Sequence, residues 1–568
     1  MKNNQQLKNS SRKHVYIGVC FILLSIPFFV FSSKVFKAYA DTVTTAVTVG
    51  NSAPSFTGGP AENPASTTTS PTNVGNNVTF QATGTDSNSE DYYLLLCSSS
   101  SATATNGGAP TCNDTTWCTS TATTSASQAT CSYTTLLADS SSNAWYAFVC
   151  DGNASSASCS TAQQGSGDSG TPFIVNHSPG FSSPANDGPK NPGQTVTWTT
   201  TSSDSDSNTV KLIVCKTAGI SGDACDGGGA DTWCSSSLVA SNPTCGYEIP
   251  SVYPDASYDA YVYVVDQFDF GSTDAAQGSN VSFTVNNIAP VVSAVTINGG
   301  TAIDLTESST KEITLTATVT DNNSCYGGEI NSVLGYVYRS GVAYSGCDTS
   351  GEADNNYCYP EVSCTVVGGT CTDDTDGSAN YTCTVNLQYY TDPTDINTEY
   401  PDDNWLDTIK ATDDDASPHN TEVSTGVELN SLTAFDVTGS INFGGLGADE
   451  SNDPLDKTVT TTPTGNVGLD QEHSGSTNMC VDYPTCSGGT PIGVSYQKYA
   501  LASLTAYSSG TVLSTSATEV ELNVAKATSG SPTTKDTWWG ILIPSGTEAG
   551  AYSGANTITA VKGEIVNW

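Results

Sequence analysis

The sequence lacks the patterns on which most known catalytic centres are built. It has four histidines in 568 residues, and three of them, His177, His419 and His473, stand in separate segments after residue 40. No HExxH, GxSxG or P-loop pattern occurs, which excludes the commonest zinc-protease, serine-hydrolase and nucleotide-binding motifs. We therefore expect that the protein is not an enzyme. A secreted hydrolase that works through paired carboxylates is the alternative, because aspartate and glutamate are plentiful.

Basic side chains are also scarce. The chain has 17 lysines and arginines against 57 aspartates and glutamates. Six of the basic residues lie in residues 1–40, which hold no acidic side chain, so residues 41–568 carry 11 basic and 57 acidic groups, a net charge of −46. Such a field repels nucleic acid and anionic lipid and attracts cations. Nucleic acid is therefore excluded as a partner.

Long apolar runs are absent after the first 40 residues. The run from Val15 to Phe31 follows four basic residues, and Ala38-Tyr39-Ala40 supplies the small-x-small pattern of a signal peptidase site. We predict an export signal that is cleaved before Asp41, with an uncleaved membrane anchor as the alternative. The mature chain is then secreted, extracellular or on the cell surface, with no membrane span.

Cysteines, in contrast, are abundant. Setting aside Cys20 in the predicted signal leaves 18, in groups of six, four, six and two. Even numbers in an exported chain indicate disulfides within domains rather than zinc sites. Cys150 and Cys159 occur in the first group alone and should pair, and so should Cys480 and Cys486. Pairing is left open for the other cysteines: Cys97, Cys112, Cys118, Cys131, Cys215, Cys225, Cys234, Cys245, Cys325, Cys347, Cys358, Cys364, Cys371 and Cys383.

A module of about 110 to 140 residues occurs three times in tandem. In each copy an aspartate, Asp86, Asp204 or Asp321, follows eight residues after the first apolar residue of an alternating strand. Each boundary has the same pattern, a short strand followed by Asn or His and then by proline. Proline ends the strand because it cannot continue the hydrogen bonding of a β-ladder. The predicted segments are 1–40 (signal peptide), 41–54 (lead strand), 55–178, 179–289 and 290–430 (modules one to three) and 431–568 (a distinct fourth domain).

The lead strand has the form of the last strand of a further module. Val47-Thr-Val-Gly-Asn-Ser-Ala-Pro54 repeats the pattern of Phe283-Thr-Val-Asn-Asn-Ile-Ala-Pro290. We expect it either to pair with the first domain or to hang free.

Seven or so short strands per module, separated by Gly, Asn, Asp and Ser turns, predict an all-β fold. The pattern resembles tandem immunoglobulin-like and cadherin-like β-sandwiches of secreted bacterial surface proteins. It implies disulfide-braced, immunoglobulin-like β-sandwich domains after the signal peptide. Trp117-Cys118 and Trp233-Cys234 fall in the cysteine-rich stretch, where we expect a loop and not a core pair. The end of the fourth domain, 538–561, resembles the C-terminal β-sandwich of many secreted bacterial surface proteins of unknown function.

Aspartates recur at one pole of each predicted sandwich. In an immunoglobulin-type sandwich, the loops after the second and the penultimate strand lie at the same pole, near the preceding linker. The predicted metal ligands in these loops are Asp86, Asp151, Asp204, Asp206, Asp266, Asp321 and Asp413. Calcium is the candidate cofactor because it takes six to eight oxygen ligands from flexible loops, and the cadherin-like resemblance implies stiffening by calcium. The alternative is that these side chains cap turns.

Paired aromatics are a second candidate binding feature. Tyr389-Tyr390 and Trp538-Trp539 could line a sugar-binding face, although packing within strands is the alternative. The expected function is an exported cell-surface structural or adhesive protein: a stalk, surface-layer or adhesin component. The expected partners are a cell-envelope polymer, another cell surface or a second copy of the chain. A carbohydrate-binding surface protein and a carboxylate-dependent hydrolase are the alternatives.

Overall fold

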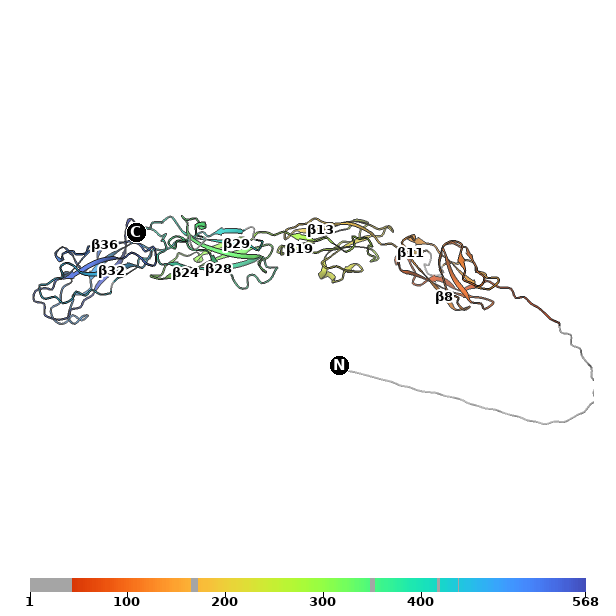
Figure 1. Cartoon of the computed structure of the whole chain (residues 1–568), viewed down its shortest axis with the longest axis horizontal. Helices are drawn as coiled ribbons and strands as arrows, with labels where there is room; N and C mark the ends of the chain where they lie inside the picture. Colours follow the sequence, from red (N-terminus) through yellow and green to blue (C-terminus); the bar gives the residue numbers. More distant parts are fainter. Residues whose placement is uncertain (1–42, 165–171, 348–352, 416–418, 438) are drawn as a thin grey trace, which may run out of the picture.

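The computed structural model describes residues 43–164, 172–347, 353–415, 419–437 and 439–568. They form four β-rich units in an extended row, with the first module at one end and the fourth domain at the other (Figure 1). The helical elements in this part of the chain are six 3-10 turns: η1 (Gly228–Asp231), η2 (Asn298–Gly300), η3 (Tyr344–Gly346), η4 (Val494–Tyr496), η5 (Tyr507–Ser509) and η6 (Ile565–Asn567). Within the described ranges, no helix has the length and apolarity needed to cross a bilayer. The predicted export signal and its cleavage site lie outside the described residues.

The first module consists of two antiparallel sheets. Its strands are β1 (Ser55–Glu62), β2 (Thr72–Asn73), β3 (Asn77–Thr85), β4 (Tyr92–Cys97), β5 (Ala102–Thr103), β6 (Thr111–Cys112), β7 (Thr116–Thr119), β8 (Gln128–Thr134), β9 (Ser142–Asn143), β10 (Tyr146–Asp151) and β11 (Phe173–Asn176). One sheet has the order β1-β3-β8 and the other β10-β4-β7. The last strand, β11, pairs with β2 and β9 and closes the side of the sandwich.

The second module repeats this plan. Its strands are β12 (Gly180–Asn186), β13 (Thr195–Ser203), β14 (Val210–Cys215), β15 (Ile220–Ser221), β16 (Ala224–Cys225), β17 (Thr232–Ser235), β18 (Thr244–Glu248), β19 (Ala256–Tyr258), β20 (Tyr261–Asp266), β21 (Ser279–Asn280) and β22 (Phe283–Val285). The sheet orders are β12-β13-β18 and β17-β14-β20-β21. The last strand, β22, pairs with β19.

The third module has longer strands in the same arrangement. They are β23 (Val291–Ile297), β24 (Thr310–Thr320), β25 (Ile330–Arg339), β26 (Val362–Ser363), β27 (Thr365–Val366), β28 (Ser378–Gln388), β29 (Trp405–Asp413) and β30 (His419–Val423). The sheet orders are β23-β24-β28-β27 and β26-β25-β29-β30. All three modules therefore share the strand order of an immunoglobulin-like β-sandwich, and the predicted fold class is confirmed.

The fourth domain is a sandwich of different topology. Its strands are β31 (Phe435–Val437), β32 (Lys457–Pro463), β33 (Leu469–Gly475), β34 (Gln497–Ala500), β35 (Thr511–Val512), β36 (Thr518–Val524), β37 (Lys535–Ile541) and β38 (Asn556–Lys562). A five-stranded sheet, β31-β32-β37-β34-β35, faces a three-stranded sheet, β36-β33-β38. β31 and β38 are therefore edge strands.

Each module has its own core, formed by the inward residues of alternating strands. Along β13, Val196 and Trp198 are fully buried while the residues between them are more exposed, as the two-residue period of a strand requires. The ring of Trp198 packs edge-on against Phe283 of the last strand, with the ring centroids 5.4 Å apart. Such edge-to-face contacts add to the stabilisation that burial gives.

The Trp-Cys pairs belong to the core, so the loop expectation was wrong. Trp233-Cys234 lies in β17, the edge strand next to β14. Trp233 is 7% exposed and packs edge-on on Phe283 at 5.1 Å. Cys234 bonds to Cys245 of β18, in the opposite sheet. The disulfide thus joins the two sheets, and spacing along the sequence does not reveal such a cross-sheet contact.

Nine disulfides brace the described residues. Cys150 pairs with Cys159 and Cys480 with Cys486, the two pairs expected from the sequence. In the first two modules the remaining cysteines pair with the next one along the chain: Cys97–Cys112, Cys118–Cys131, Cys215–Cys225 and Cys234–Cys245. The pairs of the third module are Cys325–Cys371, Cys347–Cys358 and Cys364–Cys383. Every disulfide therefore closes within one domain.

Candidate metal centres at the domain junctions

The repeated aspartate closes the turn after the second strand of each module. Oδ1 of Asp86 accepts hydrogen bonds from the backbone N–H of Asn88 (2.6 Å) and of Glu90 (3.4 Å). Oδ1 of Asp204 accepts an equivalent bond of 2.7 Å from the N–H of Asp206. Oδ2 of both aspartates is buried without a hydrogen-bond partner. One oxygen caps the turn, as the alternative interpretation held, and the other is free for a cation.

An asparagine in the segment before each module reaches the second predicted aspartate of that module. The Nδ2 group of Asn51 donates to Oδ2 of Asp151 at 2.9 Å. The other two pairs repeat this contact, Asn176 with Asp266 at 2.6 Å and Asn287 with Asp413 at 3.1 Å. The acidic poles therefore lie against the preceding segment, where the sequence placed them.

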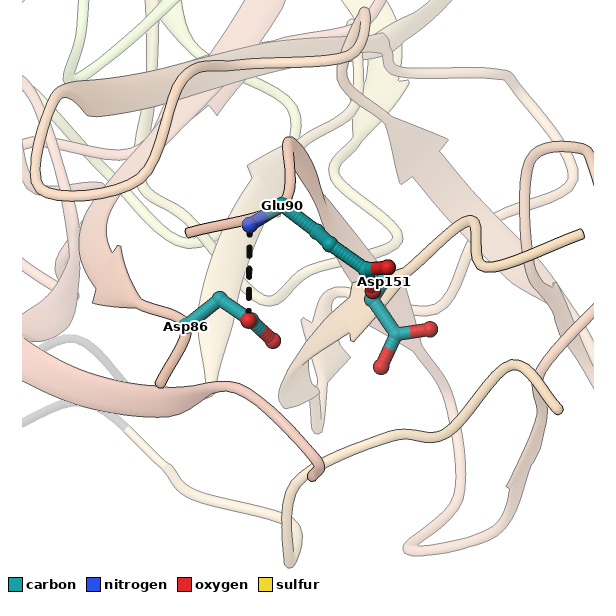
Figure 2. Close-up of side chains that lie close together, drawn as sticks. All are labelled: Asp86, Glu90 and Asp151. Atoms are coloured by element: carbon teal, nitrogen blue, oxygen red, sulfur yellow. Dashed lines mark hydrogen bonds between the residues drawn. The ribbon is translucent and has the colours of Figure 1, made fainter. Parts of the chain in front are cut away.

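The first pole gathers three carboxylates, those of Asp86, Glu90 and Asp151 (Figure 2). One oxygen of each lies within 4.8 Å of the others. Asp86 and Asp151 are buried, and Oδ2 of Asp86, Oε2 of Glu90 and Oδ1 of Asn51 have no hydrogen-bond partner. No lysine or arginine among the described residues forms an ion pair with these carboxylates. Buried oxygens without donors are costly, and hard cations such as calcium prefer ligands of this kind.

Protein donors bind the oxygens of Asp206 and Asp266 at the second pole, whereas Oδ2 of Asp204 has no hydrogen-bond partner. Asp206 accepts from the backbone N–H of His177 at 2.6 Å and lies 3.0 Å from its ring Nδ1. Oδ1 of Asp266 accepts from two backbone N–H groups of its own loop, and Asn176 takes the other oxygen. Burial raises the pKa of Asp204 and of Asp266. The described part of this pole has no cluster of three carboxylates, and hydrogen bonds link Asp206 and Asp266 to the segment before the second module.

The junction between the second and third modules gathers carboxylates from both. Asp255 of the second module lies with Glu329 and Asp414 of the third, with one oxygen of each within 4.8 Å of the others. Asp321 and Asp413, the predicted ligands, are buried, and Oδ1 of Asp413 has no hydrogen-bond partner. Sequence reasoning missed Asp255 and Glu329 because neither occupies the repeated position. Juxtaposition of two modules brings them together.

Burial and mutual repulsion disturb the titration of this junction. Burial, together with the nearby charge of Asp255, raises the pKa of Glu329 to about 8. Burial also raises the pKa of Asp321 to about 6, with a contribution from the charge of Asp413. Both carboxyl groups therefore keep their protons to a higher pH than an exposed carboxyl group does.

We expect the stability of the third module to fall as pH rises in the presence of a chelator. The folded-state pKa of Glu329, about 8, lies above its ordinary value of 4.5. Its contribution is thus fully present below pH 4.5 and is lost as pH rises through about 8. Calorimetry of residues 41–568 across this range tests the expectation. Glu329→Gln should flatten the profile, whereas the exposed Glu422→Gln should leave it unchanged. A profile of Glu329→Gln with the wild-type slope would contradict the expectation.

A third carboxylate cluster lies in the fourth domain and was not predicted. Asp470 of β33, Glu521 of β36 and Glu564 after β38 each place one oxygen within 4.8 Å of the other two. The charge of Glu564, followed by that of Asp470, raises the pKa of Glu521. The fourth domain does not repeat the modules, so no sequence signal marked these residues.

One ring of each aromatic pair is buried, whereas Trp538 and Tyr390 are half-buried. Trp539 is fully buried in the fourth-domain core, and Tyr389 is 9% exposed. The hydroxyl group of Tyr389 donates to the carbonyl oxygen of Ser529 at 3.3 Å, across the boundary between the third module and the fourth domain. These rings therefore serve packing.

No protein-family model and no curated protein matches the chain. Similar solved structures include the N-terminal eight immunoglobulin domains of Down Syndrome Cell Adhesion Molecule, with 7% identity, a TM-score of 0.16, and coverage of 89% of this chain and 54% of that one. A marsupial T cell receptor has 12% identity and a TM-score of 0.27 over 64% of this chain and 99% of its own. The structure of Dpr2 Ig1-Ig2 in complex with DIP-Theta Ig1-Ig3 has 8% identity and a TM-score of 0.24, with coverage of 67% of this chain and 99% of that one.

Proposed function

We propose that the chain is an extracellular structural or adhesive rod whose junctions are stiffened by calcium. The observation that carries the proposal is the first pole, where Asn51, Asp86 and Glu90 each offer a buried oxygen without a hydrogen-bond partner. A calcium ion there would be held both by the module and by the segment before it. Such an ion would fix the angle between them.

The architecture supports a mechanical role. Four domains with separate cores follow one another in a row (Figure 1). Nine disulfides brace them, which is typical of proteins in oxidising compartments outside the cytoplasm. A rod of this kind holds its ends far apart and can present one end to another surface.

The two junctions between modules differ in their need for a cation. Protein hydrogen bonds already join the first and second modules, through Asn176 and His177. Hydrogen bonds through Asn323 also join the second and third modules. That junction alone adds three clustered carboxylates, those of Asp255, Glu329 and Asp414, and like charges repel. Calcium would therefore act mainly at the second of these junctions and at the first pole.

Small-angle scattering on residues 41–568, first with chelator and then with millimolar calcium, tests the proposal. We expect the maximum dimension and the stiffness to increase with calcium. Asp255→Asn with Glu329→Gln should abolish the part of the change that arises at the second–third junction. The charge-matched pair Glu312→Gln with Glu422→Gln lies on exposed strand positions and should behave as wild type. An identical profile in both buffers would contradict the proposal.

A further inference from the structure

The segment before the first module has the sequence of a strand but pairs with no described strand. Residues 43–49 read Val-Thr-Thr-Ala-Val-Thr-Val, and their alternation places Val43, Thr45, Val47 and Val49 on one side of an extended chain. Val43, Val47 and Val49 are 83%, 87% and 76% exposed. The backbone of residues 43–50 makes no hydrogen bond with any described residue. A β-branched face of this kind normally belongs in a sandwich.

The equivalent strands of the chain are all buried in the module that precedes their proline. Phe283 and Val285 of β22 stand where the aligned pattern has Val47 and Val49, and both are 2% exposed. Phe173 and Val175 of β11 are likewise buried in the first module. Strand 43–49 is therefore a terminal strand without a sandwich among the described residues.

The fourth domain has an open apolar groove. Two adjoining hollows of about 580 and 650 Å³ share Ser440, Ile441, Phe443 and Met479 in their walls. The apolar lining includes Ile441, Phe443, Met479, Ile492, Ile541 and Ile558. Val459 and Ile558 reach the groove from opposite sheets, so the groove opens into the interior of the sandwich.

Strand pairing is incomplete along this groove. β38 pairs with β33 on one side only, which leaves its other edge free. Residues 439–446, on the facing wall, form no backbone ladder with any described strand. A free edge opposite an unpaired segment is the setting in which an extended peptide adds as a further strand.

We infer that the groove of the fourth domain binds strand 43–49 of a second copy of this chain. The strand would add to the free edge of β38 at its Asn556 end and direct its valine face into the hollows between residues 556–558 and residues 439–446. This partner assignment deepens the proposed structural role and rests on it, but it does not depend on calcium.

Charge favours this pairing over others. Residues 43–50 carry no charged side chain, and among the residues lining the two hollows only Glu548 is charged. The chain as a whole has a net charge of −40, so most of its surface repels a second copy. A neutral strand in a neutral groove avoids that repulsion.

The positions of strand and groove require two molecules. The first module and the fourth domain lie at opposite ends of the row (Figure 1). Lys562, at the end of β38, donates to the carbonyl of Ile396 in the third module, so the Asn556 end of β38 and the groove beside it face away from that module. Each copy thus offers a strand at one end and a groove at the other, which gives a head-to-tail filament.

Mixing two variants that each lack one half of the contact tests the inference. The acceptor variant lacks residues 41–50 and keeps the groove, and the donor variant keeps the strand and carries Ile558→Lys. In sedimentation velocity, residues 41–568 should form oligomers that lengthen with concentration, and each variant alone should stay monomeric. The mixture should give a one-to-one dimer. Oligomers that persist without residues 41–50, or a mixture that stays monomeric with both variants folded, would overturn the inference.

A peptide provides a route that does not rely on the folding of the Ile558→Lys variant. Peptide 41–50 should bind the acceptor variant and shorten wild-type oligomers, whereas the same peptide with Val47→Lys and Val49→Lys should do neither. Equal binding of both peptides, or of none, would overturn the inference. All measurements are made with chelator and with calcium. If the chain assembles but its scattering does not respond to calcium, only the calcium proposal is contradicted. If its scattering responds to calcium but the chain does not assemble, only the binding of strand 43–49 to the groove is contradicted.

Discussion

Calcium should raise the free energy of unfolding of the first module by about 2.7 kcal/mol when its free concentration is a hundred times the dissociation constant. The reason is that the cation would occupy a site whose carboxylates, those of Asp86, Glu90 and Asp151, lie within 4.8 Å of one another. The double variant Asp86→Asn with Glu90→Gln should be less stable than the wild type in calcium but more stable than the wild type in chelator. Without calcium this variant should be more stable than the wild type, because like charges are removed, and it should not respond to calcium.

Chemical denaturation of residues 41–568, followed by domain-resolved proteolysis, measures this effect. The charge-matched control is Asp91→Asn with Asp114→Asn, two exposed positions of the same module, and it should keep the full calcium response. A calcium response retained by Asp86→Asn with Glu90→Gln would show that the cation binds elsewhere.

Removing the disulfide between Cys234 and Cys245 should lower the free energy of unfolding of the second module by about 3 kcal/mol. The bond spans 11 residues and restricts the unfolded chain. It also joins the two sheets beside the buried ring of Trp233, so Cys234→Ala with Cys245→Ala removes packing as well. Calorimetry of the full mature chain should show one domain transition shifted to lower temperature.

The bond between Cys480 and Cys486 supplies the comparison. It spans 6 residues, and its removal should cost about 2 kcal/mol on the same scale, in the fourth domain alone. Because each module has a separate core, neither double variant should shift the transitions of the other modules. A shift of all four transitions together would mean that the domains unfold as one unit.

Local patterns predicted much of the chain correctly. Even cysteine groups indicated disulfides, and two cysteines present in one repeat alone, Cys150 and Cys159, do pair. The repeated spacing located Asp86 and Asp204 at the turn after the second strand, where their Oδ1 atoms cap it. These features depend on residues near one another in the sequence. A repeated module makes such local features recognisable, because the same residues recur at the same spacing in each copy.

Features that join distant segments were not predictable in this way. Nothing in the spacing of Trp233-Cys234 distinguishes a loop from an edge strand tied to the opposite sheet. Asp255 and Glu329 come from two modules, and their carboxylates meet because the modules are docked end to end. The contact of Asp206 with His177 of the preceding segment likewise joins residues 29 positions apart, and no spacing pattern indicated it.

The sequence by itself determined the β-sandwich class, the order of the domains, the disulfide-rich character and the acidic poles, since alternation, turn residues and cysteine parity act over short distances. Tertiary structure decided which cysteines pair within the shared set and which carboxylates share a junction. It also decided that Val47 and Val49 are exposed while Phe283 and Val285, in the same pattern, are buried. The physical reason is that burial depends on what lies opposite a strand. That neighbour is set by the packing of segments far apart along the chain.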